Sequence, residues 1–157
     1  MSAILIYAAV LLWFTVTAPA EVPTHFDATG RADDWDSKAS LVAIFVPLGL
    51  GIPILFSIRA IWVRVPRALI NAPHKNYWFD HDKTTYFYDC LMEFMRINAG
   101  ALALLFAVIL SSISATAASS TPGDTGVQVP IIVAPIGFLI AAAASVWLLY
   151  RRLEPRR

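Results

Sequence analysis

The chain has 157 residues, of which 58% are hydrophobic and 15% charged, with a mean hydropathy of +0.64 and a formal net charge of +1. Soluble domains are about half apolar and a quarter charged, so this composition indicates a single membrane domain over residues 1–157. The near-neutral charge gives no basis for nucleic-acid binding, and the single cysteine, Cys90, excludes an intrachain disulfide.

Four apolar blocks predict four membrane-spanning helices, because about 20 apolar residues cross the hydrocarbon core of a bilayer. The predicted spans are residues 3–20, 39–62, 97–118 and 129–150. The first block also resembles a signal peptide, but no basic residue precedes it. In the second block Pro47 and Pro53 predict a kink or hinge, although Pro and Gly are common in membrane helices generally. We therefore expect an all-α, four-helix integral membrane protein.

The distribution of Lys and Arg predicts which loops face the cytoplasm. Ten of the twelve Lys and Arg residues lie in residues 59–96 and in the tail 151–157, and the other two lie in residues 21–38. Cytoplasmic flanks of membrane spans collect these residues. Both termini are therefore expected in the cytoplasm, with an outer loop at 21–38 and an inner loop at 63–96.

The outer loop holds the candidate ligand-binding residues. His25 and Asp27 are two apart, so they share a face in an extended segment, where they could bind a divalent ion or a cationic peptide. The other ligand-binding candidates are Asp33, Trp35 and Lys38. The alternative is a hydrogen-bonded loop without a metal. In that loop Gly30 forms a turn, and residues 36–37 cap the second span.

The inner loop holds the candidate partner-docking residues, which are His74, Tyr77, Trp78 and His81. The alternative for this group is an aromatic cluster at the membrane interface. From about Asp82 the apolar and polar residues follow helical spacing, which predicts that the third span extends into the cytoplasm.

The spans themselves lack the residues of a permeation path. No Asp, Glu, Lys or His lies inside a predicted span, whereas transporters place such residues there. Asn98 is the most polar residue of the third span, and Ala141–Ser145 is a small-residue face suited to helix packing. Nucleophile and base residues are split between loops, so we expect no enzyme activity and no cofactor.

Two segments carry a resemblance to a known family. Residues 22–38, V-P-T-H-F-D-A-T-G-R-A-D-D-W-D-S-K, and residues 71–78, N-A-P-H-K-N-Y-W, are similar to signatures of the bacterial membrane domain of unknown function 1648. The resemblance covers roughly residues 1–100. It implies a relation to SdpI-type immunity proteins, which protect a bacterium from its own toxic peptide and signal that the toxin is present.

These observations predict a non-enzymatic, multi-pass protein of the bacterial cell membrane. Its outer loop would act in immunity or sensing, and a peptide is a possible ligand. The alternative is an accessory or structural subunit of a larger membrane complex. In either case the expected partners are the lipid bilayer and other membrane proteins or further copies of this chain.

Overall fold

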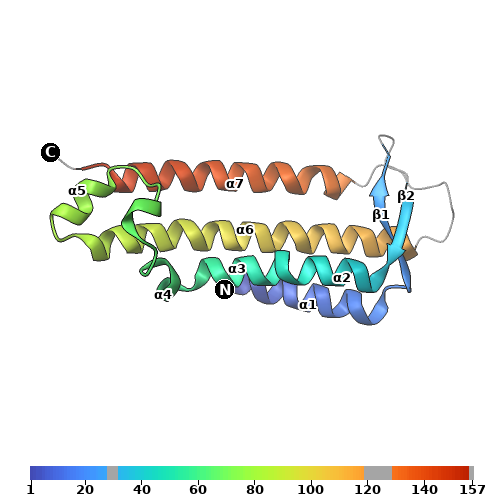
Figure 1. Ribbon diagram of the computed structural model, residues 1–157. Helices are drawn as coiled ribbons and strands as arrows, with labels where there is room; N and C mark the ends of the chain where they lie inside the picture. Colours follow the sequence, from blue (N-terminus) through green and yellow to red (C-terminus); the bar gives the residue numbers. More distant parts are fainter. Residues whose placement is uncertain (28–31, 119–128, 156–157) are drawn as a thin grey trace.

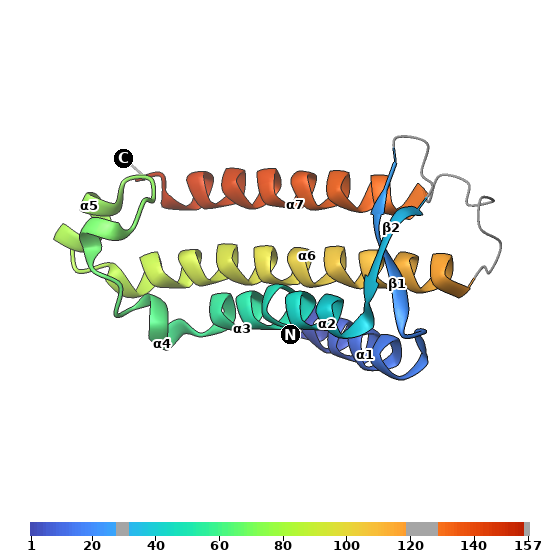
Figure 2. The same ribbon diagram turned by 45° about the vertical axis from the view of Figure 1, so that its right-hand side comes forward.

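The computed structural model describes residues 1–27, 32–118 and 129–155, with side chains in the last segment from residue 133 onward. Gly30, expected to form a turn, lies outside the described residues, as do Arg31, Arg156 and Arg157 of the charge count. In the described part, long helices run side by side, and a two-stranded hairpin lies at one end of the bundle (Figures 1 and 2).

The described elements follow one another in this order: α1 (Ser2–Thr17), β1 (Glu21–Phe26), β2 (Ala32–Ser37), α2 (Lys38–Val46), the π-helical turn η1 (Pro47–Gly51), α3 (Ile52–Ser57), α4 (Arg59–Trp62), the 3-10 turn η2 (Arg67–Leu69), α5 (Lys75–Asp80), α6 (Thr84–Ala118) and α7 (Val129–Leu153). Helix α6 is the spine of the bundle. It packs against α1 and α3 on one side and against α7 on the other (Figure 1).

Small residues on α6 bring its neighbours close. Ala103 and Ala107 are buried, and they share a core cluster with Tyr7, Leu11 and Phe14 of α1. Small side chains allow helix backbones to approach and gain van der Waals contact, which is the main packing force between helices in lipid.

In the part of the chain that the structure describes, three helical segments are long and apolar enough to cross a membrane, namely Lys38–Ser57, Thr84–Ala118 and Val133–Leu153. Only 11% of the apolar window of the last segment is buried in the protein, so most of its apolar surface faces outward, as lipid contact requires. This confirms a multi-pass helical membrane protein. Helix α1 is apolar but has 16 residues and ends at Thr17, short of the predicted 3–20.

The second predicted span, 39–62, ends earlier than expected and contains an irregular turn. Pro47 and Pro53 have no N–H to donate, and between them the helix widens into η1, where the N–H of Ile52 bonds to the carbonyl of Pro47. At Ile58 the backbone is extended, with φ −89° and ψ 98°. The membrane helix therefore stops at Ser57, and α4 is a separate turn.

Residues 21–38, predicted as a loop, contain two short strands that the all-α prediction did not include, while the described chain is otherwise mostly helical. Strands β1 and β2 form an antiparallel hairpin (Figure 2). Ser37 ends β2 and caps α2, because its side chain accepts a hydrogen bond from the N–H of Ser40. The predicted cap is confirmed for Ser37, whereas Asp36 accepts from the N–H of Ser37 instead.

Candidate functional site

The hairpin has one strand held by the bundle and one strand facing outward. In β1, Val22 and Pro23 are fully buried, and this strand packs against α6. In β2, all five residues from Asp33 to Ser37 are exposed. An isolated two-stranded hairpin is marginally stable in water, so the buried part of β1 is what holds the exposed strand β2 in place.

Lys38 joins the hairpin to the end of α1. Its ammonium donates to the carbonyl of Thr15 at 2.9 Å and to that of Ala18 at 2.7 Å. The last carbonyls of a helix have no partners within it, and a cation there also interacts favourably with the helix dipole. Lys38, predicted as a ligand-binding residue, is thus engaged in capping α1.

Replacing Lys38 with Met should destabilise the protein by about 1 kcal/mol. The thioether keeps the length of the stem but donates no hydrogen bond to the Thr15 and Ala18 carbonyls. Thermal unfolding in detergent measures the loss, and Lys38→Arg, which retains a cation, should keep most of the stability. An unchanged melting temperature for Lys38→Met would show that the cap is unimportant.

His25 pairs across the hairpin with Asp33. Its Nδ1 lies 2.5 Å from the Asp33 Oδ1, and both side chains are exposed. The strand register is irregular on both sides of His25, and such bulges redirect side chains. His25 therefore meets Asp33 of the other strand, a contact that the sequence did not predict.

The Asp33 carboxylate, by its hydrogen bond and its charge, raises the pKa of His25 above its ordinary value of 6.5. The stabilisation from the ion pair between His25 and Asp33 is therefore fully present below pH 6.5 and is lost as the pH rises through the raised pKa of His25. We expect an NMR titration of His25 to show this higher pKa. Asp33→Asn should lower it more than Asp34→Asn, and equal effects would contradict the pairing.

On the edge of β2 that faces away from β1, backbone N–H groups donate to aspartate side chains of the same strand. The N–H of Lys38 points toward β1, where it bonds to Ala20, so the N–H groups of Trp35 and Ser37 point to the opposite edge. Each of these two groups donates to the carboxylate of the residue before it, Asp34 and Asp36. Proteins protect exposed strand edges in this way, which leaves β2 to recognise ligands through its side chains.

Three aspartates and one tryptophan are exposed along β2, and in a strand Trp35 points to the opposite face from Asp34 and Asp36. Trp35 is 48% exposed, and Asp34 and Asp36 precede and follow it. Among residues 1–27, 32–118 and 129–155, no group of three His, Cys, Asp or Glu side chains is placed to hold a metal. The exposed side chains of β2 are therefore mainly acidic.

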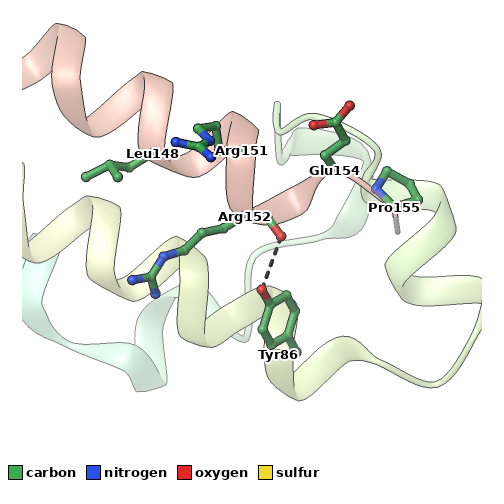
Figure 3. Close-up of a pocket in the computed structure, with 6 residues that line it drawn as sticks. All are labelled: Tyr86, Leu148, Arg151, Arg152, Glu154 and Pro155. Carbon is green, nitrogen blue, oxygen red and sulfur yellow. Dashed lines mark hydrogen bonds between the residues drawn. The ribbon is translucent and has the colours of Figure 1, made fainter. Parts of the chain in front are cut away.

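At the opposite end of the bundle, side chains cap α7. The Trp78 indole N–H donates to the carbonyl of Leu153 at 2.9 Å, and the Tyr86 hydroxyl donates to that of Arg152 at 3.1 Å. Figure 3 shows the second bond beside a hollow of about 620 Å³ that Arg151 and Glu154 also line. Two of the last carbonyls of α7 thus receive partners from α5 and α6.

Three ion pairs connect helices at this end of the bundle, away from the hairpin. They are Arg59 of α4 with Asp89 of α6, Arg67 of η2 with Asp80 of α5, and Arg152 of α7 with Glu93 of α6. Phe87 and Leu91 are buried on the apolar face of α6. This confirms the amphipathic extension of the third span, which begins at Thr84.

The partner-docking candidates differ in exposure. His74 and His81 are exposed and Tyr77 is half-buried, with the Tyr77 and His81 rings 4.4 Å apart. Trp78 is only 8% exposed and belongs to the core of this end. A docking surface here would therefore consist of His74, Tyr77 and His81. Trp78 would lie buried below this surface and support it.

The helices and the hairpin define a multi-pass membrane protein with an extramembrane β-hairpin. Residues 3–51, about a third of the chain, match the family model described as Domain of unknown function (DUF1648). The matched segment runs from α1 through the hairpin to the end of η1. No curated protein and no solved structure matches the chain.

Proposed function

We propose that this protein is a non-enzymatic membrane protein that binds a cationic peptide through its hairpin. The exposed acidic surface of β2 carries this proposal. Residues 21–38 hold five acidic and two basic residues, and one of the two, Lys38, is turned toward the carbonyls of α1. Such a surface attracts cationic ligands, and Trp35 adds a ring on which Lys or Arg can stack.

The distribution of positive residues supports a cytoplasmic location for both termini and an outer location for the hairpin. This topology requires α1 to be a fourth span. Its 16 residues extend about 24 Å, somewhat less than the hydrocarbon core of about 30 Å. A Cβ at Gly100, in the first half of α6, would lie 3.6 Å from the Cβ of Ala3, so α1 runs beside most of the apolar length of α6.

The resemblance to SdpI-type proteins supports a narrower role in immunity or sensing at the bacterial plasma membrane. A toxic cationic peptide would bind the hairpin from outside. The exposed surface formed by His74, Tyr77 and His81 would then contact a cytoplasmic partner. Helix α6 offers a physical connection, because it packs against β1 and α5.

Peptide binding to the protein in lipid nanodiscs tests the proposal. The probes are a short peptide of alternating lysine and valine and a matched peptide with glutamate in place of lysine. The double variant Asp34→Asn/Asp36→Asn should weaken binding of the lysine peptide about tenfold or more. Glu154→Gln, a matched change at the other end of the bundle, should not. Equal binding of both peptides to the natural protein would refute the proposal.

A second candidate is an accessory subunit of a larger membrane complex. The outward apolar surface of α7 favours it, because Ala143, Ala144 and Ile140 are exposed there and small residues suit helix packing in lipid. Native mass spectrometry of protein extracted in mild detergent separates the two candidates. Defined larger polypeptides in the complex would support the subunit role.

A further inference from the structure

An apolar groove of about 520 Å³ runs between α1, α6 and α7. Small residues of all three helices line it, including Ala3, Gly100 and Gly137. A Cβ built at Gly137 would meet nothing within 4 Å. The groove is therefore open space within the apolar part of the bundle, wide enough for a flexible chain beside Gly137.

A polar hollow of about 530 Å³ adjoins this groove at the end away from the hairpin. Arg96 and Ile97 line both spaces. In the hollow Asp89 is paired with Arg59, and Glu93 is paired with Arg152. Arg96 is exposed and forms no ion pair with any residue that the structure describes. The lining of the hollow holds two guanidinium groups, those of Arg59 and Arg96, and two carboxylates. Arg152 pairs with Glu93 from outside this lining, so no carboxylate of the hollow is left to balance the charge of Arg96.

We propose that the groove and the hollow together bind one anionic phospholipid, with its phosphate at Arg96 and an acyl chain beside Gly137. Guanidinium groups form strong, charge-assisted hydrogen bonds with phosphate. Basic pockets between membrane helices on the cytoplasmic side typically bind anionic headgroups. A phospholipid brings an anionic phosphate that can pair with the positive charge of Arg96. An apolar helix from a second copy of the chain would bring no anion, so the charge favours the lipid.

This lipid site is independent of the hairpin and its ligand. The groove is formed where α1, α6 and α7 meet, and β1 and β2 contribute nothing to its lining. A bound acyl chain would fill the space between α1 and α7 on the surface of α6, and so would hold these two helices to their common neighbour.

Native mass spectrometry tests the proposal on the whole protein in a neutral detergent. Phosphatidylglycerol and phosphatidylcholine with identical chains are added separately. We expect one phosphatidylglycerol to be retained in preference to phosphatidylcholine. Arg96→Gln should lower that preference roughly five- to tenfold. Gly137→Leu, whose Cβ would meet no atom within 4 Å, places a side chain in the groove and should abolish retention of both lipids.

Arg151→Gln is the matched control, because Arg151 is an exposed arginine at the same end that stacks on Trp147, outside the groove. It should leave lipid retention unchanged. A fall as large as that of Arg96→Gln would show general surface attraction and overturn the site. Equal retention of the two lipids by the natural protein would also overturn it. So would a homodimer, free of lipid, that Gly137→Leu dissociates, because a second copy would then occupy the groove.

Discussion

Replacing Gly49 with Ala should destabilise the protein by about 3 kcal/mol. Gly49 lies in η1 directly against the ring of Tyr7, and a Cβ there would come 2.5 Å from the Tyr7 hydroxyl oxygen and closer still to the ring carbons. Tyr7 is fully buried, and its hydroxyl donates to the carbonyl of Phe45 at 2.7 Å. The ring therefore has no free space to move into. Thermal unfolding in detergent measures the effect.

Gly51→Ala is the matched control for this prediction. Gly51 lies in the same turn, but a Cβ there would only reach ordinary contact, 3.9 Å from Pro47. It should be neutral or slightly stabilising, because Ala favours helical backbone over Gly. Tyr7→Ala should remove most of the penalty of Gly49→Ala in a double-mutant cycle. Additive losses in that cycle would contradict the direct contact between the two residues.

Replacing Trp78 with Ala should destabilise the end of the bundle away from the hairpin by about 4 kcal/mol. The change removes a buried indole from the cluster that includes Ile70 and Leu153. It also removes the donor to the Leu153 carbonyl and the ring contact with Tyr86, whose centroid lies 4.9 Å away. Thermal unfolding should show the loss, and limited proteolysis should show earlier cleavage near α5.

Two further variants separate the causes of that loss. Trp78→Phe keeps an aromatic ring but not the indole N–H, so it should cost about 1 kcal/mol from the lost hydrogen bond, and more if the smaller ring leaves a gap. Trp147→Ala changes a tryptophan that is 56% exposed on α7 and should have little effect on folding. If Trp147→Ala proved as damaging as Trp78→Ala, burial would not explain the difference between the two sites.

The helices were predictable because their signals are long. Apolar runs of span length predicted the helices of residues 97–118 and 129–150, and helical spacing from about Asp82 predicted the extension of α6. Pro47 and Pro53 predicted a distortion in the second span. The widened turn and the break at Ile58 depend on which carbonyls find partners, and that is decided by the neighbouring helices.

The hairpin could not be predicted from local pattern. Residues 32–37, A-D-D-W-D-S, show no alternation of apolar and polar residues, and Asp is depleted in strands. The strand exists because β1 is anchored by Val22 and Pro23 and because Asp34 and Asp36 satisfy its edge donors. Repeated Asp at alternate positions was the one available signal of that edge protection.

The sequence places the candidate residues in one region, but it does not predict the contacts that they make. The sequence grouped His25 with Asp27, and the bulged register adds a contact between His25 and Asp33 that the sequence did not predict. It grouped Lys38 with the ligand-binding residues, whereas the ammonium reaches back to α1 over a separation of 20 or more residues. Contacts of this kind depend on the position of α1 beside the hairpin, which no local pattern records.

The most direct test of peptide binding by the hairpin is an NMR titration of the five tryptophan indole N–H resonances in nanodiscs. The probe is the peptide of alternating lysine and valine. Binding at β2 predicts the largest shift at the Trp35 resonance, because the other tryptophans lie in α1, α4, α5 and α7. Shifts at Trp78 or Trp62 with Trp35 unchanged would place the peptide at the other end and contradict the account.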